Sequence, residues 1–354
     1  MIIYIGIAFG ISFLLTYFVT PPLINIANEK KLFDQPNSRR LNDIAIPTIG
    51  GIAIFFGWVI ASLLCLRGDF IDGMQYLFVA MLLMFFVGLK DDIITIVAWK
   101  KFVIQICAAI LLVIFGDFKI IDAYGFMGIA VLNEWISIPL SVLLILFITN
   151  AINLIDGIDG LSSGLSILIS LCLGIGFYFA GDIGYTIICF ALLGSLVAFL
   201  RFNLSNGKYR TFMGDTGSLV IGIFLAAVAI HFSNNVTVEN LAFMNPPVMA
   251  LALFIVPVTD TLRVFFIRIK NRQSPFSPDM NHFHHLLIKG GMTHIQGTCF
   301  LIAYTVFFIL LSHLFSYFEL EITVSFFLLL FLSFFTVVPI AAVCNSKYDK
   351  RKNT

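Results

Sequence analysis

The stretch Ile183-Gly-Tyr-Thr-Ile-Ile-Cys-Phe-Ala-Leu-Leu-Gly-Ser-Leu-Val-Ala-Phe-Leu200 decides the fold, because it contains no charged side chain from end to end. A helix of this length extends roughly 27 Å, close to the ~30 Å hydrocarbon core of a bilayer. Eleven such apolar runs recur along the chain. They cover approximately residues 2–20, 49–66, 75–89, 102–116, 135–152, 161–180, 183–200, 217–232, 247–267, 297–317 and 323–343. This pattern predicts an all-α fold, a polytopic membrane helix bundle of about 11 transmembrane helices.

The composition supports the same class. Of the 354 residues, 60% are hydrophobic and 12% are charged, and the mean hydropathy is +1.01. Such values exclude an ordinary soluble domain. The longest polar stretches are residues 29–47, 90–101, 201–216 and 268–296, each too short for a separate soluble domain. We therefore expect residues 1–354 to form one integral membrane domain.

Basic residues divide the loops between the runs into two classes. Nineteen of the twenty-one Lys and Arg residues fall in alternate loops or in the C-terminal tail, and only Arg67 and Lys119 fall in the loops between. Because cytoplasmic loops are enriched in Lys and Arg, the N-terminus is predicted outside and the C-terminus in the cytoplasm. Residues 346–354 then form a short basic cytoplasmic tail. No small-residue cleavage site follows the first run, so we expect it to remain as a helix.

Two adjacent carboxylates follow the third run in the sequence Lys90-Asp91-Asp92, and Lys101 precedes the fourth run. Like charges this close favour a divalent cation or a shared proton between them. A solvated loop of mixed charge is the alternative.

A denser group of amides and carboxylates ends the fifth run, in Asn150-Ala-Ile-Asn153-Leu-Ile-Asp156-Gly-Ile-Asp159-Gly160. On a helix, Asn150, Asn153 and Asp156 recur at i, i+3 and i+6 and share roughly one face. The glycines allow a tight turn and the close approach of a ligand. The alternative is that these residues only cap two helices around a turn. Unpaired carboxylates near a membrane are costly, which favours a functional site.

The segment Arg210-Thr-Phe-Met-Gly214-Asp215-Thr-Gly-Ser218 enters the eighth run on the same side. Backbone N–H groups at the start of a helix can bind phosphate, and a carboxylate there can bind the metal that accompanies phosphate. The alternative is an N-cap that binds no ligand.

Residues 274–285, with the sequence SPFSPDMNHFHH, hold half of the six histidines, and Arg263 lies upstream. Histidines beside arginines can donate hydrogen bonds to a diphosphate, accept a proton or bind a metal. The histidines of interest are His282, His284 and His285. A zinc site and a solvated His-rich loop are the alternatives. The remaining histidines are interpreted as structural or surface residues: His231, His294 and His313.

Together, these segments provide what transfer of a phosphorylated group requires. A metal held by carboxylates neutralises phosphate charge, and cationic side chains stabilise the negative charge that develops during transfer. The membrane setting implies a lipid co-substrate. The residues alone therefore predict metal-assisted phosphoryl chemistry at the inner leaflet.

The same segments resemble the polyprenyl-phosphate N-acetylhexosamine-1-phosphate transferases, which form glycosyltransferase family 4. The resemblance covers positions 40–285 in the family's order and rests on residues 40–51 (RLNDIAIPTIGG), Asp91-Asp92 with Lys101, residues 150–161, residues 212–218 (FMGDTGS) and residues 274–285. The histidine pattern is more similar to the WecA-type UDP-N-acetylglucosamine branch than to the MraY-type branch, which carries three consecutive histidines. Asn42 departs from the family pattern, because many relatives have histidine there.

The resemblance implies that the phosphate of undecaprenyl phosphate attacks the β-phosphorus of a UDP-N-acetylhexosamine and that UMP leaves. It also implies Mg²⁺ as the cofactor, with Mn²⁺ as an alternative, held by Asp215 and secondarily by Asn153. The implied catalytic residues comprise a pair at the lipid phosphate, a pair at the nucleotide and two histidines: Asp91, Asp92, Asp156, Asp159, His284 and His285. The candidate substrate-binding residues are Lys101, Asn150, Arg210, Arg263 and His282.

The expected partners are a UDP-N-acetylhexosamine, undecaprenyl phosphate and the lipid bilayer. No nucleic-acid partner is expected, and a homodimer is left open. The expected location is the bacterial inner membrane, with the active site facing the cytoplasm. There the reaction would start a lipid-linked glycan for O-antigen, capsule or another cell-envelope polysaccharide.

Two other functions remain open from the sequence. One is the MraY-type phospho-MurNAc-pentapeptide transferase of peptidoglycan synthesis. The other is a membrane transporter, which predicts ionisable residues at mid-span depth on several helices. The centres of the runs are almost free of charge, which disfavours the transporter.

Overall fold

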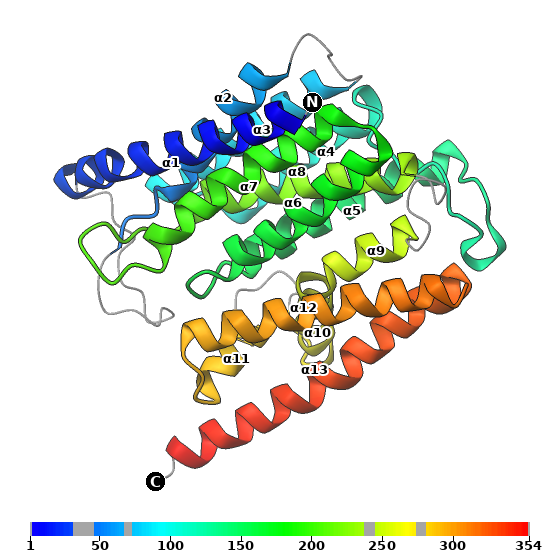
Figure 1. The fold of residues 1–354 in the computed structure, drawn as a ribbon. Coiled ribbons are helices and arrows are strands. Elements are labelled where there is room, and N and C mark those ends of the chain that lie inside the picture. Colours follow the sequence, from blue (N-terminus) through cyan, green and yellow to red (C-terminus); the bar gives the residue numbers. More distant parts are fainter. Residues whose placement is uncertain (1, 31–45, 67–72, 237–244, 274–280, 353–354) are drawn as a thin grey trace.

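The structure is a computed structural model that describes residues 2–30, 46–66, 73–236, 245–273 and 281–352. Within these ranges every regular element is helical, and an isolated β-bridge joins Asp122 and Val131. The prediction of an all-α fold is confirmed (Figure 1).

Each of the eleven apolar runs forms a helix or a pair of consecutive helices, because a continuous apolar segment satisfies its backbone hydrogen bonds best as a helix in lipid. The helices of the runs are α1 (Ile2–Lys30), α2 (Gly50–Cys65), α3 (Met74–Ile93), α4 (Ala98–Ile110) with the π-helical η1 (Leu111–Phe115), α5 (Glu134–Leu154), α6 (Leu161–Ala180), α7 (Ile183–Asn203), α8 (Gly214–Asn235), α9 (Pro246–Leu253) with α10 (Ile255–Lys270), α12 (His294–Tyr317) and α13 (Ile322–Lys352). Two short elements lie between them: the 3₁₀ turn η2 (Phe126–Gly128) and α11 (Phe283–Lys289).

Eight of the described helices are long and apolar enough to cross a membrane, and the α9–α10 pair makes up to nine. The eight are α1, α4 with η1, α5, α6, α7, α8, α12 and α13. The protein is thus a multi-pass membrane protein. The count of eleven adds α2, which has 16 residues, and α3, and this count and the orientation of the chain stay predictions.

Two of the predicted runs differ from the helices that form. The run 247–267 is not one straight helix, because α9 and α10 meet at Phe254 with a bend of 66°. Pro257 explains the bend, since it has no N–H and its ring clashes with the carbonyl group four residues earlier. The first helix continues past Pro21 and Pro22 to Lys30.

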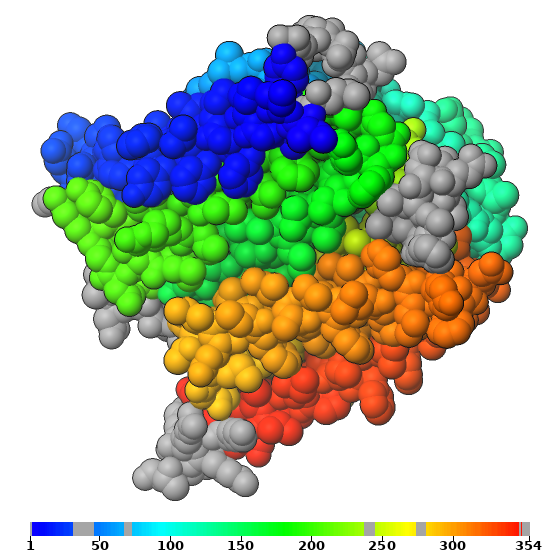
Figure 2. All heavy atoms as spheres, viewed as in Figure 1, coloured from blue at the N-terminus to red at the C-terminus, as the bar shows by residue number. Residues whose placement is uncertain are grey.

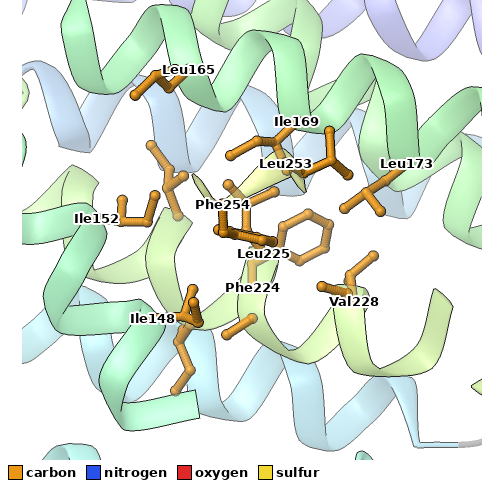
Figure 3. Packing of buried hydrophobic residues seen from close by; sticks show 14 of the residues in the cluster. Ile148, Ile152, Leu165, Ile169, Leu173, Phe224, Leu225, Val228, Leu253 and Phe254 are labelled. Atoms are coloured by element: carbon orange, nitrogen blue, oxygen red, sulfur yellow. The ribbon is translucent and has the colours of Figure 1, made fainter. Parts of the chain in front are cut away.

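Helix α8 lies at the centre of the bundle, with α2, α3, α5 and α6 around it (Figure 1). Its side chains are buried on all sides, which explains why the sequence of α8 is apolar around the whole helix. Figure 3 shows Phe224 and Leu225 of α8 packed between Ile148 of α5 and Ile169 of α6. Because α8 is fixed on every side, the polar residues at its first turn are placed accurately.

The C-terminal helices α12 and α13 lie to one side of this core (Figure 1). The space-filling view shows α12, in orange, packed against the green helices along this face, with α13, in red, on the other side of α12 (Figure 2). Large apolar side chains remain exposed on the outer helices, for example Phe18 on α1 and Phe335 on α13. A lipid environment accounts for this exposure.

Candidate active site

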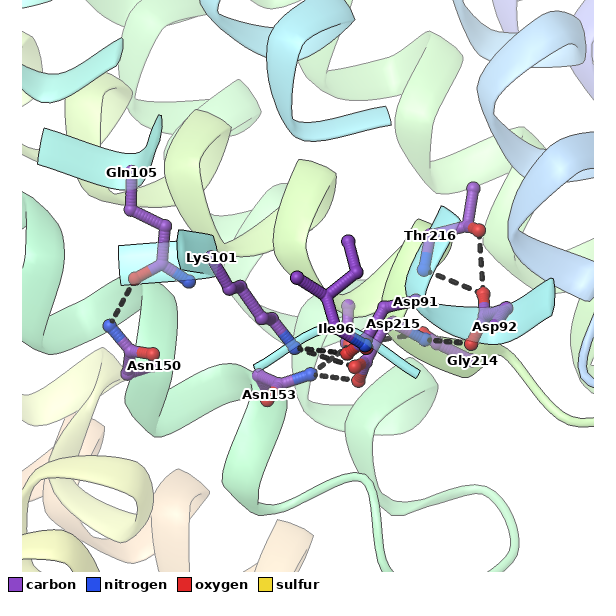
Figure 4. A network of polar contacts seen from close by, with 11 residues as sticks. Asp91, Asp92, Ile96, Lys101, Gln105, Asn150, Asn153, Gly214, Asp215 and Thr216 are labelled. Carbon is purple, nitrogen blue, oxygen red and sulfur yellow. Dashed lines mark hydrogen bonds and ion pairs between the residues drawn. The ribbon is translucent and has the colours of Figure 1, made fainter. Parts of the chain in front are cut away.

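The first turn of α8 is held by a carboxylate from another helix. Asp92, at the end of α3, accepts hydrogen bonds from the backbone N–H groups of Asp215 and Thr216, both at 2.9 Å, and from the Thr216 hydroxyl at 2.6 Å (Figure 4). A carboxylate at a helix N-terminus is stabilised by the free N–H groups and by the helix dipole. Asp92 therefore fixes the start of α8 and, with it, the position of Asp215.

Close backbone contact makes this arrangement possible. A Cβ atom on Gly88 of α3 would lie 2.5 Å from the Cα atom of Thr216, and one on Gly214 would lie 2.6 Å from Asp92 Oδ2. Gly214 also has a φ of +71°, which favours glycine. Any other residue at either position would push α3 and α8 apart.

Lys101 of α4 bridges two carboxylates that are far apart in the sequence. Its Nζ donates to Asp91 Oδ2 at 3.1 Å and to Asp215 Oδ2 at 2.5 Å (Figure 4). Asp91 also accepts a hydrogen bond from the backbone N–H of Ile96 at 2.6 Å. The side chain of Asp215 is 31% exposed, so it remains accessible from the end of the bundle.

The amides of α5 face this group from the other side. Asn153 donates through Nδ2 to Asp215 Oδ1 at 2.6 Å and to Ser218 Oγ at 2.8 Å. Asn150 instead donates to Gln105 Oε1 on α4 at 2.9 Å and to the Leu146 carbonyl at 2.8 Å. The predicted polar face of α5 therefore divides into Asn153, which lies in the carboxylate cluster, and Asn150, which ties α5 to α4.

We define the carboxylate cluster as Asp91, Asp92, Lys101, Asn153 and Asp215. It contains three carboxylates and one ammonium group, so negative charge is in excess. Oxygen ligands of this kind are those that Mg²⁺ prefers, and Mg²⁺ usually takes one or two carboxylates together with substrate phosphates.

The donor set therefore fits a magnesium ion at Asp215. Within the described part of the chain, no three His, Cys, Asp or Glu side chains are grouped as a complete metal site. Substrate phosphates and water would have to supply the remaining ligands. The amide of Asn153 would have to rotate, because it now turns its Nδ2 toward Asp215.

A second group of charges lies at the turn between α5 and α6. Asp159 accepts hydrogen bonds from Arg210 Nη2 at 2.7 Å and from His294 Nδ1 at 2.9 Å, and its backbone carbonyl accepts one from Thr298 at 2.8 Å. Burial alone would raise the pKa of Asp159. The hydrogen bonds from His294 and Arg210 outweigh that effect and hold its pKa below the ordinary value.

A third group is buried where α10 meets α11. Asp260 is 2% exposed and accepts hydrogen bonds from Arg263 Nη2 at 2.9 Å, from His282 Nδ1 at 3.0 Å and from the Phe283 N–H at 2.8 Å. Arg263 also donates to the carbonyl of Asn281. Two of the predicted substrate-binding residues thus meet at one carboxylate.

His284 connects the third group to the α5–α6 turn. Its ring packs against Gly157 so closely that a Cβ atom there would lie 2.2 Å from His284 Nε2. Both ring nitrogens of His284 are buried and have no hydrogen-bond partner among the described residues. Burial lowers the pKa of His284 well below its usual value, and His285 adds to the effect. The lowered pKa favours the neutral form of the His284 ring.

The sequence prediction of converging segments can be compared with these contacts. The structure brings Asp91, Asp92, Lys101, Asn153 and Asp215 into one cluster. Asp156 lies in the turn after α5, next to Gly157, and His285 follows His284 in α11. Residues 40–45, including Asn42, and residues 274–280 lie outside the described part of the chain.

Several residues of these groups were not singled out as site residues from the sequence. His294, interpreted as structural or surface, lies in the second group beside Asp159. Gln105 and Ser218 received no role, yet each pairs with an asparagine of α5. Asp260 was also missed, although an ionisable residue inside the run 247–267 is itself a signal of function.

The fold and the three groups define a class: a multi-pass membrane protein with a carboxylate-rich, cation-bridged site at one end of its helix bundle. Comparison with known proteins narrows the class. The family described as Glycosyl transferase family 4 matches residues 74–233. This range contains most of the residues of the helices that carry the carboxylate cluster. It also contains Asp159 and Arg210 of the second group.

Curated relatives match over most of their length. A protein of Bacillus subtilis (strain 168), described as a probable undecaprenyl-phosphate N-acetylglucosaminyl 1-phosphate transferase, is 33% identical over 86% of this chain and 82% of its own. The undecaprenyl-phosphate alpha-N-acetylglucosaminyl 1-phosphate transferase of Escherichia coli (strain K12) is 30% identical over 77% of this chain and 73% of its own. The decaprenyl-phosphate N-acetylglucosaminephosphotransferase of Mycobacterium tuberculosis (strain ATCC 25618 / H37Rv) is 32% identical over 79% of this chain and 75% of its own. The chain belongs to glycosyl transferase family 4, and this confirms the resemblance found in the sequence and favours the transferase over the transporter.

Proposed function

We propose that this protein transfers N-acetylglucosamine-1-phosphate, or a closely related N-acetylhexosamine-1-phosphate, from a UDP-sugar to undecaprenyl phosphate. The observation that carries the proposal is the bridge from Lys101 to Asp91 and Asp215 at the end of α8. It gathers cation-binding oxygens and a fixed ammonium group in one place, as phosphoryl transfer requires. The names of the relatives supply the class of acceptor, a polyprenyl phosphate.

The reaction is a displacement at phosphorus. An oxygen of the lipid phosphate attacks the β-phosphorus of the UDP-sugar, the bond from that phosphorus to the bridging oxygen breaks, and UMP leaves with the electron pair. The product is a lipid diphosphate that carries the sugar. The site would face the cytoplasm of the bacterial inner membrane, where UDP-sugars are present, and the reaction would start a lipid-linked glycan.

Each residue of the carboxylate cluster would have a separate role. Asp215, with Asn153, would hold Mg²⁺, which when bound neutralises phosphate charge. Lys101 places a positive charge beside the phosphates, and Asp91 orients the lipid phosphate or takes its proton. Asp92 keeps the first turn of α8 in place.

The other two groups would bind the donor substrate. Arg210 and Asp159 lie at the turn assigned to the nucleotide, and Arg263 with the loop histidines supplies donors for the diphosphate and the sugar. A homodimer is not needed for any of these contacts.

The test is an assay of the purified protein in detergent or nanodiscs with undecaprenyl phosphate, Mg²⁺ and a panel of labelled UDP-sugars. We expect UMP and a labelled lipid with UDP-N-acetylglucosamine or one of its epimers. The reaction should stop when EDTA removes the divalent cation and resume with Mg²⁺, and with Mn²⁺ in its place. Turnover of UDP-MurNAc-pentapeptide alone would select the peptidoglycan enzyme instead. No UMP with any sugar tried would refute the transferase.

A further inference from the structure

The buried carboxylate of Asp260 lies in the second turn of α10, just beyond the 66° bend. It is 2% exposed, and Arg263 beside it is 6% exposed. An ionised group so far from water is costly unless charge and hydrogen bonds compensate it. Its presence inside an apolar helix therefore needs an explanation.

Both oxygens of Asp260 are used to hold residues of the donor side. Oδ1 accepts from Arg263 Nη2 and from the N–H of Phe283, the first residue of α11, and Oδ2 accepts from His282 Nδ1. One carboxylate thus joins α10 to the segment that precedes α11. Removing it would take a hydrogen-bond acceptor from an arginine, a histidine and the start of a helix at once.

The contact with His282 sets the chemistry of that ring. A carboxylate beside a guanidinium stays ionised and can only accept hydrogen bonds, so the Nδ1 atom of His282 must carry a proton. The other ring nitrogen, Nε2, is then the atom that His282 can present to a ligand. Fixing one ring nitrogen in order to orient the other is a common role of carboxylates beside functional histidines.

The position of His282 connects this pair to the rest of the site. Its ring lies 5.8 Å from that of His284, at an interplanar angle of 15°. His284 packs in turn against Gly157 in the turn that carries Asp156 and Asp159. The orientation that Asp260 imposes is therefore transmitted toward the turn assigned to the nucleotide.

We infer that Asp260 is a positioning residue for recognition of the UDP-sugar: it orients Arg263 and the Nε2 atom of His282 toward the donor diphosphate and does not itself touch substrate. This inference rests on the proposed function. The donor should be affected rather than the lipid, because the carboxylate cluster assigned to the lipid phosphate contains no residue held by Asp260.

The first experiment compares Asp260→Asn with Thr259→Val in the transferase assay. Asn keeps the shape of the side chain but offers an N–H₂ group to His282 Nδ1. Thr259 is the matched control, because it is equally buried on the same helix and pairs only with Ser333 on α13 at 2.8 Å among the described contacts. We expect Asp260→Asn to lower kcat/KM for the UDP-sugar by about 10- to 100-fold, mainly through KM, with the KM for undecaprenyl phosphate within twofold of wild type. Thr259→Val should leave both constants within twofold.

A double-mutant cycle with His282→Gln tests whether Asp260 acts through the ring. If it does, Asp260→Asn costs much less in the His282→Gln background than in the wild type. Fully additive losses, or equal losses for both substrates, would overturn the inference, since a general weakening of the fold would act in that way.

A further measurement, on the wild type, does not depend on the transferase assay. Nitrogen NMR of histidine-labelled protein in nanodiscs should show a protonated Nδ1 on His282, assigned by the loss of its signal in His282→Gln. A bare Nδ1 would overturn the inference even if the transferase assay succeeds. If the wild type releases no UMP, the proposed function fails, while the NMR result still decides whether Asp260 orients His282.

Discussion

The two ends of α8 both carry a carboxylate paired with a side-chain nitrogen, but they differ in how many carboxylates are gathered there. At the first turn, Asp215 meets Lys101, which it shares with Asp91. Near the opposite end, His231 Nε2 meets Asp182 Oδ2 at 3.1 Å. Both pairs join residues that are distant in the sequence, and both are half-buried.

The pair at the opposite end is locally complete. The second ring nitrogen of His231 lies 3.0 Å from Asn235 Nδ2, and the ring stacks on Tyr185 with centroids 4.0 Å apart. The other oxygen of Asp182 accepts a hydrogen bond from the Tyr185 N–H at 3.3 Å, as an N-cap of α7. The contacts at this end involve a single carboxylate, and both of its oxygens have hydrogen-bond partners.

The first turn of α8 has more carboxylates than cations. Asp92 adds a third carboxylate, whose oxygens are occupied by the helix N-terminus, while Lys101 is the ammonium group that bridges the other two. The comparison teaches that buried polarity alone does not mark a site in this bundle. An excess of one charge, gathered from several helices at an accessible end, does.

The largest effect is expected from Asp215→Asn. The substitution keeps the shape of the side chain but removes the charge that pairs with Lys101 and would bind the cation. We expect UMP release to fall by about 10³-fold, as when a single group that stabilises transition-state charge is removed. The measurement is UMP release at saturating UDP-sugar and undecaprenyl phosphate, over a series of Mg²⁺ concentrations. The control is an unchanged elution profile in detergent, which shows that the variant still folds. Turnover within tenfold of wild type would refute the metal role of Asp215. The carboxylates at the first turn of α8 would then have no greater effect on turnover than the pair at its opposite end.

Much of the fold could be predicted from the sequence, because a continuous apolar run in lipid can satisfy its backbone hydrogen bonds within itself only as a helix. Every apolar run became helical for this reason. The bend at Phe254 was missed, since the pattern of the run 247–267 is continuous and only Pro257 interrupts it. The end of α1 was also missed. The predicted run ended at residue 20, whereas α1 continues past Pro21 and Pro22, and Ile24 and Ala27 beyond them are buried against Ile49 of the segment before α2.

The sequence predicted which residues belong to the site better than it predicted the contacts between them. The motifs indicated Asp91, Lys101 and Asp215, but nothing in the spacing says that one ammonium group bridges the two carboxylates. Such contacts depend on how closely α3, α4 and α8 pack, and packing of distant segments is not encoded in a local pattern. Asn150 shows the same limit: its helical spacing places it on the face of Asn153, yet its partner is Gln105 on α4.

An intermediate effect is expected from Gly88→Ala, which tests whether close packing of α3 on α8 places Asp215. The added Cβ atom would lie 2.5 Å from Thr216 Cα and 2.6 Å from the carbonyl carbon of Asp215, so the helices must separate. We expect turnover to fall by roughly tenfold and the free energy of unfolding to fall by about 1–3 kcal/mol. The measurements are UMP release and thermal unfolding in detergent.

The matched control for this change is Gly10→Ala on α1, where an added Cβ atom would meet nothing within 4 Å. It should leave turnover unchanged and unfolding unchanged or slightly improved, because alanine favours the helix. If Gly88→Ala behaves like Gly10→Ala, the α3–α8 contact does not position the site.

The smallest effect on turnover is expected from Asp182→Asn. Asparagine is as good an N-cap as aspartate, so the hydrogen bond from Tyr185 N–H can persist, and only the contact of the carboxylate with His231 is changed. Because such half-exposed pairs contribute little, we expect the free energy of unfolding to fall by no more than about 1 kcal/mol. Turnover should stay within twofold of wild type, measured under the conditions used for Asp215→Asn. A tenfold loss would mean that the opposite end of α8 acts on the site through the helix. Asp182 and His231 would then contribute to catalysis and not only to the stability of the fold.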